Sequence, residues 1–261
     1  MSRTRTYLNS RVLVAFALLM SASLLAHETG LVPWASAESQ VRLVRSVKTD
    51  FFKLSNFFVS QDNGLYCGLA SSAIVLNALY FGDAAKELPE DKTSIAKEET
   101  KFLPEGFNPY FKKVTQNNLL NDRTKTKLQV LGAPAEGTEK ADYGLQLRQL
   151  VQVLTSHGAK VDVRVVTDDA SEAEIKKELI ENLSRKDDYV LVNYKRADLL
   201  AQGGGGHISP LGAYDEESDS FLIMDVNPNK ATWVWAPADT LIKAMRTFDT
   251  VENRGYLLIQ K

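Results

Sequence analysis

Cys67, His207 and Asp225 are residues of this 261-residue chain whose types and order fit nucleophilic acyl transfer. A cysteine attacks a carbonyl carbon as the thiolate, which needs an imidazole to take its proton and a third group to orient that ring. The sequence therefore predicts Cys67 as nucleophile, His207 as base and Asp225 as orienter. Gln61 stands six residues before the cysteine. Its amide N–H is predicted to stabilise the negative oxygen of a tetrahedral intermediate, together with the backbone N–H of Cys67.

Cys67 is the one cysteine of the chain and lies where a predicted helix begins. From this residue to about Tyr80, apolar residues recur at helical spacing, namely Leu69, Ala73, Leu76 and Leu79. Backbone N–H groups and the positive end of the helix dipole favour a thiolate at such a position. A free cysteine is also often a small buried core residue, so a purely structural Cys67 is the alternative.

The sequence contexts of His157 and His207 differ. His157 ends a predicted helix and precedes Gly158, which is typical of a helix C-terminus and predicts a structural role. His207 follows four consecutive glycines, residues 203–206, and begins a strand-like run. Four glycines are entropically costly, which favours a flexible loop beside a cleft over its alternative, a solvated linker. Asp225 ends an apolar run, where an acid is costly to bury unless it accepts hydrogen bonds.

The remaining pattern predicts an α+β fold with a helix-rich first half and a mostly antiparallel sheet. Residues 51–54 and 56–59 look extended, and residues 83–140 look irregular. Helices are predicted over residues 142–157, 171–183 and 237–248, the second opened by a Ser171–Glu174 capping box. Strands are predicted over residues 161–166, 189–194, 207–214, 221–226, 232–235 and 256–259. No boundary divides this pattern into two domains.

The motifs around these residues resemble the catalytic domain of phytochelatin synthases. They are Gln61-x5-Cys67-Gly-Leu-Ala-Ser-Ser, Val192-Asn193-Tyr194-x-Arg196, residues 206–214 (GHISPLGAY), Ile223-Met224-Asp225-Val226 and Arg254-Gly255-Tyr256. His207 follows Cys67 by 140 residues, within the interval of about 130–150 that papain-type enzymes show. The likeness covers most of the chain, more loosely over residues 83–140. It implies a papain-like α+β fold with the nucleophile at a helix N-terminus.

The resemblance implies that glutathione is the substrate. Cys67 would attack the Cys–Gly bond, release glycine and hold γ-glutamylcysteine as a thioester. Water would then hydrolyse the thioester, or a second glutathione would take the acyl group and begin a phytochelatin. The resemblance places Arg196, Arg254, Gly206 and Ser209 among the substrate-binding residues. Guanidinium groups suit this role because they pair with carboxylates.

The chain has no second cysteine and ends at Lys261, whereas plant members of the family carry a cysteine-rich C-terminal region. The resemblance is therefore to the short bacterial form, which implies mainly hydrolysis with weak transfer. One cysteine and few histidines do not suffice for a metal cage. We therefore expect no cofactor and no metal bound by the protein itself. Cadmium or zinc would arrive as a thiolate of glutathione.

The first 37 residues are predicted to be a signal peptide, which leaves residues 38–261 as a single catalytic domain. Three arginines precede an apolar run over residues 12–26, and Ala35-Ser36-Ala37 fits the small-x-small cleavage pattern. The alternative is an uncleaved N-terminal anchor. Either version predicts a periplasmic or secreted protein with no other membrane domain. The net charge is −2 with both signs interleaved, which does not indicate nucleic-acid binding.

Two other functions compete with this interpretation. A cysteine peptidase acting on longer peptides would use the same catalytic residues with an open groove. A non-catalytic binding module would keep Cys67 buried and slow to alkylate. The sequence leaves the oligomeric state open, with a homodimer as one option.

Overall fold

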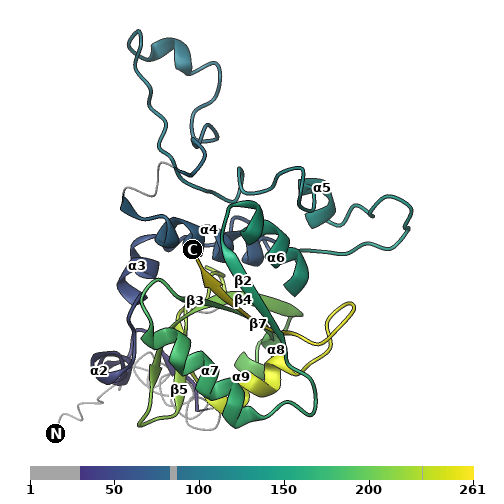
Figure 1. Ribbon diagram of the computed structural model, residues 1–261. Helices are drawn as coiled ribbons and strands as arrows, with labels where there is room; N and C mark the ends of the chain where they lie inside the picture. The colour runs from purple at the N-terminus through teal and green to yellow at the C-terminus, as the bar shows by residue number, and fades with distance from the viewer. Residues whose placement is uncertain (1–29, 83–86, 231) are drawn as a thin grey trace, which may run out of the picture.

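The computed structural model describes residues 30–82, 87–230 and 232–261. Within these ranges, seven strands form one antiparallel sheet in the order β1-β6-β5-β4-β3-β7-β2. Figure 1 labels β2, β3, β4, β5 and β7 of this sheet. The strands are β1 (Val32–Pro33), β2 (Lys160–Val165), β3 (Tyr189–Lys195), β4 (Gly206–Asp215), β5 (Ser220–Ile223), β6 (Val234–Pro237) and β7 (Gly255–Gln260). Nearly all residues of the central strands β3, β4 and β5 are buried, which fits a sheet covered on both faces.

Helices cover both faces of the sheet. The helices are α2 (Ala37–Arg45), α3 (Phe51–Asn56), α4 (Cys67–Leu79), α5 (Lys127–Val130), α6 (Leu147–Ser156), α7 (Glu172–Ser184), α8 (Arg196–Leu200) and α9 (Ala238–Met245), with a 3₁₀ turn, η2 (Thr100–Phe102). The side chains of β3 point alternately to the two faces of the sheet and therefore pack in two separate cores. Leu191 packs in the core of α4 and α6, whereas Val190 and Val192 pack in the core of α7, α8 and α9. The predicted α+β fold is confirmed.

Most predicted elements are present, but the segment before the nucleophile differs from prediction. The predicted helix from Cys67 is α4, and the predicted helix ending at His157 is α6, for which His157 is the C-cap. Residues 51–56 form helix α3 instead of an extended segment. Phe51 and Leu54 face the core, and this three-residue spacing also fits one helical face, so the prediction for residues 51–54 was wrong.

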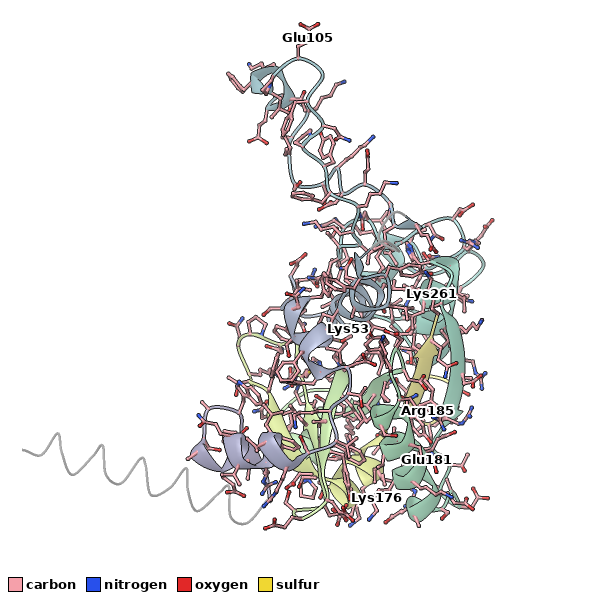
Figure 2. The ribbon with its side chains drawn as sticks, turned by 60° about the vertical axis from the view of Figure 1, so that its left-hand side comes forward. Lys53, Glu105, Lys176, Glu181, Arg185 and Lys261 are labelled. Atoms are coloured by element: carbon pink, nitrogen blue, oxygen red, sulfur yellow. The ribbon has the colours of Figure 1, made fainter. Side chains whose placement is uncertain are left out.

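Residues 88–113 form an arm that extends away from the sheet (Figure 1). Its two sides pair at the base, where the backbone N–H of Asp91 donates to the Phe111 carbonyl at 2.8 Å and that of Lys113 donates to the Pro89 carbonyl at 3.0 Å. Glu105 lies at its tip (Figure 2). The arm is part of the region predicted to be irregular, residues 83–140.

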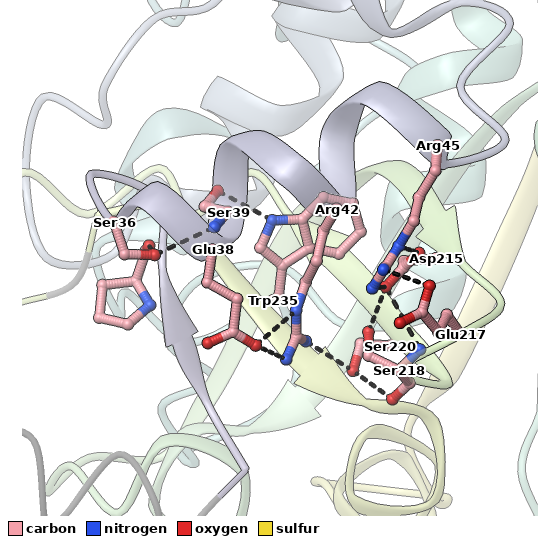
Figure 3. A network of polar contacts seen from close by, with 11 residues as sticks. Ser36, Glu38, Ser39, Arg42, Arg45, Asp215, Glu217, Ser218, Ser220 and Trp235 are labelled. Carbon is pink, nitrogen blue, oxygen red and sulfur yellow. Dashed lines mark hydrogen bonds and ion pairs between the residues drawn. The ribbon is translucent and has the colours of Figure 1, made fainter.

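Helix α2 is fixed to the sheet by a polar network (Figure 3). Ser36 caps the helix by accepting from the Ser39 N–H at 3.1 Å. Arg45 donates to both Asp215 carboxylate oxygens at 2.6 and 2.7 Å. Trp235 donates from Nε1 to Ser39 at 2.9 Å. None of the helices in the described ranges has the length and apolarity that a membrane crossing requires.

Candidate active site

Cys67 is the first residue of helix α4, as predicted. The helix is packed on all sides, since eleven of its thirteen residues are buried, and the small side chains Ala70, Ser71 and Ala73 allow close approach to the sheet. Ser71 donates to the Ile208 carbonyl of β4 at 3.0 Å, which joins the helix to the strand of His207. Cys67 itself is only partly buried. The thiol therefore lies at an accessible helix N-terminus.

His207 is the second residue of β4 and is paired in register with Tyr194 of β3. Its Nε2 lies 3.0 Å from Oδ1 of Asp225, and its ring forms a hydrogen bond with the Cys67 thiol. Because Nε2 faces the acid, Nδ1 is the ring nitrogen left for the thiol. The Tyr194 ring meets the imidazole edge-on with centroids 5.6 Å apart, which limits ring rotation. The structure thus brings the three residues into one chain of contacts.

Asp225 lies just beyond strand β5 and is almost completely buried. It accepts from His207, from the Asn227 backbone N–H at 2.8 Å and from the Tyr194 hydroxyl at 3.3 Å. Arg196 also donates from Nη2 to Oδ1 and Oδ2, at 2.9 and 2.7 Å. These contacts satisfy the buried carboxylate, which would otherwise be costly.

The electrostatics of the three residues favour a thiolate and an imidazolium. Burial raises the pKa of the Cys67 thiol, but the hydrogen bond and charge of His207, with the N–H groups of Ile208 and Gly68, outweigh it and lower that pKa. Burial lowers the pKa of His207, and the bonds to Asp225 and Cys67 reverse this, so its pKa is raised. Burial likewise raises the pKa of Asp225, but His207 and Arg196 bring it below its usual value. The site can therefore hold a reactive nucleophile near neutral pH.

Gln61 lies in the segment that leads to α4 and is 6% exposed. Its backbone N–H donates to the Val226 carbonyl at 2.8 Å, which joins this segment to the residue after Asp225. Its Nε2 donates to the Asn63 carbonyl at 2.6 Å, and Oε1 has no partner. An amide nitrogen carries two N–H groups, so one remains for an oxyanion.

The four residues predicted to bind substrate have different surroundings. Arg196 is buried, with Nη2 on Asp225 and Nη1 on Gln202 at 3.0 Å. Ser209 is fully buried, with Oγ 3.5 Å from the Tyr194 hydroxyl. Gly206 is exposed and lies against Arg254, since a β-carbon on Gly206 would be 3.1 Å from Nε and Nη2 of that arginine. Gly206 and Arg254 are thus adjacent. Arg196 instead contacts Asp225, and Ser209 contacts Tyr194.

Arg254 is held by the loop before β7. Its Nη2 donates to Asp249 at 2.8 Å, and its Nη1 donates to the Thr247 hydroxyl at 3.0 Å. Its Nε is buried and has no partner. Asp249 also accepts from Asn193 of β3 at 3.1 Å. A buried guanidinium N–H without a partner, beside the residue that precedes His207, is suited to an anionic group of a ligand.

An aromatic pocket of about 250 Å³ adjoins Asp225. Trp34, Phe58 and Trp233 line it, and the Trp233 ring lies 5.0 Å from each of the other two. Trp34 belongs to the N-terminal segment, so that segment contributes directly to the surroundings of the site. Within the described residues, no group of three or more His, Cys, Asp or Glu side chains could hold a metal ion.

The phytochelatin synthase family model matches residues 23–96 and 107–256, which is most of the chain. The chain belongs to the phytochelatin synthase family. The match includes all seven strands of the described sheet at least in part, and the gap at residues 97–106 falls on the tip of the arm. The family is the one predicted from the motifs around Cys67 and His207.

Individual members of the family are similar over most of this chain. Glutathione γ-glutamylcysteinyltransferase 3 of Lotus japonicus is 28% identical over 213 residues, which are 81% of this chain and 37% of the Lotus protein. Glutathione γ-glutamylcysteinyltransferase 1 of Arabidopsis thaliana is 26% identical over 236 residues, 88% of this chain and 42% of the plant protein. The chain therefore spans about two fifths of the length of these relatives.

Several residues of this phytochelatin synthase family site were not predicted from sequence. Tyr194 stands in a quoted motif, but its contact with Asp225 depends on the pairing of β3 with β4. Asp249 and Asn193 meet only through the antiparallel pairing of β3 with β7. Gln116 contacts the segment of Gln61 from a region that looks irregular in sequence. The local signal for Gln116 is a cluster of four amide side chains within residues 116–121.

Proposed function

We propose that this phytochelatin synthase family member cleaves the Cys–Gly bond of glutathione through a γ-glutamylcysteinyl thioester on Cys67. The observation that carries the proposal is the contact chain from the Cys67 thiol through His207 to Asp225, with both pKa shifts favouring the thiolate. The relatives in Lotus japonicus and Arabidopsis thaliana are named glutathione γ-glutamylcysteinyltransferases, which supports glutathione as the substrate.

Each step has a residue that suits it. The Cys67 thiolate adds to the carbonyl carbon of the Cys–Gly bond, and the oxygen takes the negative charge beside the N–H groups of Gln61 and of the Cys67 backbone. His207 gives its proton to the glycine nitrogen as the C–N bond breaks, and glycine leaves. His207 then takes a proton from water, whose oxygen attacks the thioester carbonyl. γ-Glutamylcysteine is released and the thiol is restored.

Water and a second glutathione can each accept the γ-glutamylcysteinyl group from Cys67, and the reaction with water is proposed to be the faster one. Glutathione replaces water in the minor reaction, which joins the acyl group to the amino end of a second molecule and begins a phytochelatin. Cadmium or zinc takes part as a thiolate complex of glutathione, because the one thiol of the chain is engaged with His207.

Arg254 and Gly206 are proposed to bind an anionic end of glutathione. The unpartnered Nε of Arg254 supports this role, and a side chain at Gly206 would crowd that nitrogen, since its β-carbon would lie 3.1 Å away. Arg196 is already occupied by Asp225 and Gln202. We therefore assign it to the acid instead of the substrate.

The deciding experiment compares the full-length chain with Cys67→Ser at millimolar glutathione, with and without cadmium. Glycine, γ-glutamylcysteine and longer oligomers are separated by mass. We expect glycine release that depends on Cys67, with more γ-glutamylcysteine than oligomer. Oligomer in excess would contradict the preference for water. Absence of glycine release in every condition would contradict glutathione as substrate and favour a peptidase of longer substrates.

A further inference from the structure

Gln116 holds the backbone on both sides of Gln61. Its Nε2 donates to the Ser60 carbonyl at 2.9 Å, and its Oε1 accepts from the Asp62 backbone N–H at 2.9 Å. The same Nε2 lies 3.1 Å from Oδ1 of Asp62. The side-chain amide therefore pairs with residues 60 and 62 as a neighbouring β-strand would.

The other edge of this segment is held by the residue after the candidate acid. The N–H of Gln61 donates to the Val226 carbonyl at 2.8 Å. Successive backbone groups in an extended chain point to opposite edges. Val226 thus holds residue 61 from one edge while Gln116 holds residues 60 and 62 from the other, and the position of the Gln61 side chain is fixed from both.

Gln116 is itself fixed. It is 8% exposed and lies between the buried Val114 and Leu119. Asn77 of α4 donates from Nδ2 to the Val114 carbonyl at 2.8 Å and accepts from the Val114 N–H at 3.0 Å. The loop that carries Gln116 is therefore anchored to the helix that carries Cys67.

We propose that Gln116 is a positioning residue that acts through Gln61 and keeps its amide aligned with the developing oxyanion. This inference rests on the proposed function only in assigning Cys67 and Gln61 to acyl transfer. Oxyanion donors require exact placement, since one such donor contributes about 10²–10³-fold to the rate and a displacement of about 1 Å can cost about 10²-fold. No contact between Gln116 and substrate is part of the proposal.

The test compares two reactions of Cys67 in the full-length chain. Acylation by p-nitrophenyl acetate passes through an oxyanion and releases p-nitrophenolate as a burst. Alkylation by iodoacetamide is attack by the thiolate at a saturated carbon and forms no oxyanion. We expect Gln116→Ala to slow the burst about 10- to 100-fold. The rate and pH profile of alkylation should remain those of the unsubstituted chain.

A double-mutant cycle with Gln61→Ala identifies the route of the effect. If Gln116 acts through Gln61, its substitution has no further effect once Gln61 is alanine. Asn118→Ala is the matched control, because Asn118 lies in the same loop but bonds only to the backbone of residues 113 and 115. We expect that control to leave the burst unchanged. Equal slowing of burst and alkylation, or additive effects in the cycle, would overturn the proposal.

Gln116→Met serves as the second variant, since it keeps the side-chain length and fills the same space. Loss of folding in both variants, followed by circular dichroism, would assign Gln116 to stability and overturn the positioning role. Glycine release from glutathione by the unsubstituted chain is measured in parallel. Its failure would contradict the proposed substrate without affecting the p-nitrophenyl acetate test.

Discussion

Arg196 donates from one nitrogen, Nη2, to both carboxylate oxygens of Asp225, and so shares the acid with His207. The resemblance of the motif alone suggested a substrate ligand at this position. Its side chain is 4% exposed beside a fully buried carboxylate. Two partners therefore keep Asp225 ionised while its pKa lies below the usual value, and the acid stays available to orient the imidazole.

Replacement of Arg196 should affect turnover more than substrate binding. We expect Arg196→Lys to lower kcat for glycine release about tenfold, roughly 1.4 kcal/mol of barrier, because lysine keeps the charge but lacks the second nitrogen, Nη1, through which Gln202 fixes the side chain. KM for glutathione should change less than about threefold, or roughly 0.6 kcal/mol. Steady-state kinetics checks this. A large rise in KM at constant kcat would show that Arg196 does bind substrate.

Arg196→Met should also destabilise the fold in a pH-dependent way. Loss of one partner of a buried ion pair costs about 3–5 kcal/mol. The folded-state pKa of Asp225 is lowered, so the stabilisation is complete above the unfolded value of about 4. It is lost as the pH falls through the folded value. Urea unfolding should therefore show a constant difference in the free energy of unfolding between Arg196→Met and the unsubstituted chain from pH 7 to pH 5. A difference that persists undiminished well below pH 4 would show that it does not come from the ionised Asp225.

The lowered pKa of Cys67 predicts that alkylation is fast at a lower pH than for an ordinary thiol. The hydrogen bond and charge of His207 oppose the effect of burial and favour the thiolate. We expect His207→Ala to move the pH profile of iodoacetamide alkylation upward, toward the ordinary thiol value of about 8.5. His157→Ala is the matched control, because that ring bonds the Leu119 carbonyl at 2.7 Å, away from the thiol. Equal profiles for all three proteins would contradict a thiolate held by His207.

The local features of this site could be predicted from the sequence, whereas the contacts that depend on strand pairing could not. Cys67 at a helix N-terminus and His157 as a C-cap follow from apolar spacing and neighbouring glycine, which act within a few residues. The bond from Arg196 to Asp225 requires β3, α8, β4 and β5 to be in their final places. No pattern within a few residues of Arg196 or Asp225 predicts that the two side chains meet.

A side chain at position 206 should disturb the substrate site, whereas one at position 205 should not. A β-carbon at Gly206 would lie 3.1 Å from the Arg254 guanidinium, while one at Gly205 would meet nothing within 4 Å. We expect Gly206→Ala to raise KM for glutathione about tenfold by displacing Arg254. Gly205→Ala should leave KM within about twofold, roughly 0.4 kcal/mol. Similar values for the two variants would remove Arg254 and Gly206 from the proposed substrate site.

The N-terminal boundary can be tested through residues 30–37, which the sequence pattern assigned to a cleaved signal peptide. Val32 and Pro33 pair with β6, and the Trp34 ring packs on Phe51 and Trp233 with centroids 5.9 and 5.0 Å apart. The small residues that fit a cleavage pattern also place Ser36 as the N-cap of α2. The family match begins at residue 23, before this segment.

We therefore expect a chain of residues 38–261 to be less stable than one of residues 30–261. Loss of the Ser36 cap costs about 1 kcal/mol, and loss of a packed tryptophan costs up to about 3–5 kcal/mol. Thermal melts of the two chains, with Trp34→Ala and Ser36→Ala in the longer one, separate these contributions. If the protein is processed on export, N-terminal sequencing should find a start before Val32. Equal melting of the two chains, or a start at Glu38, would show that this segment is dispensable.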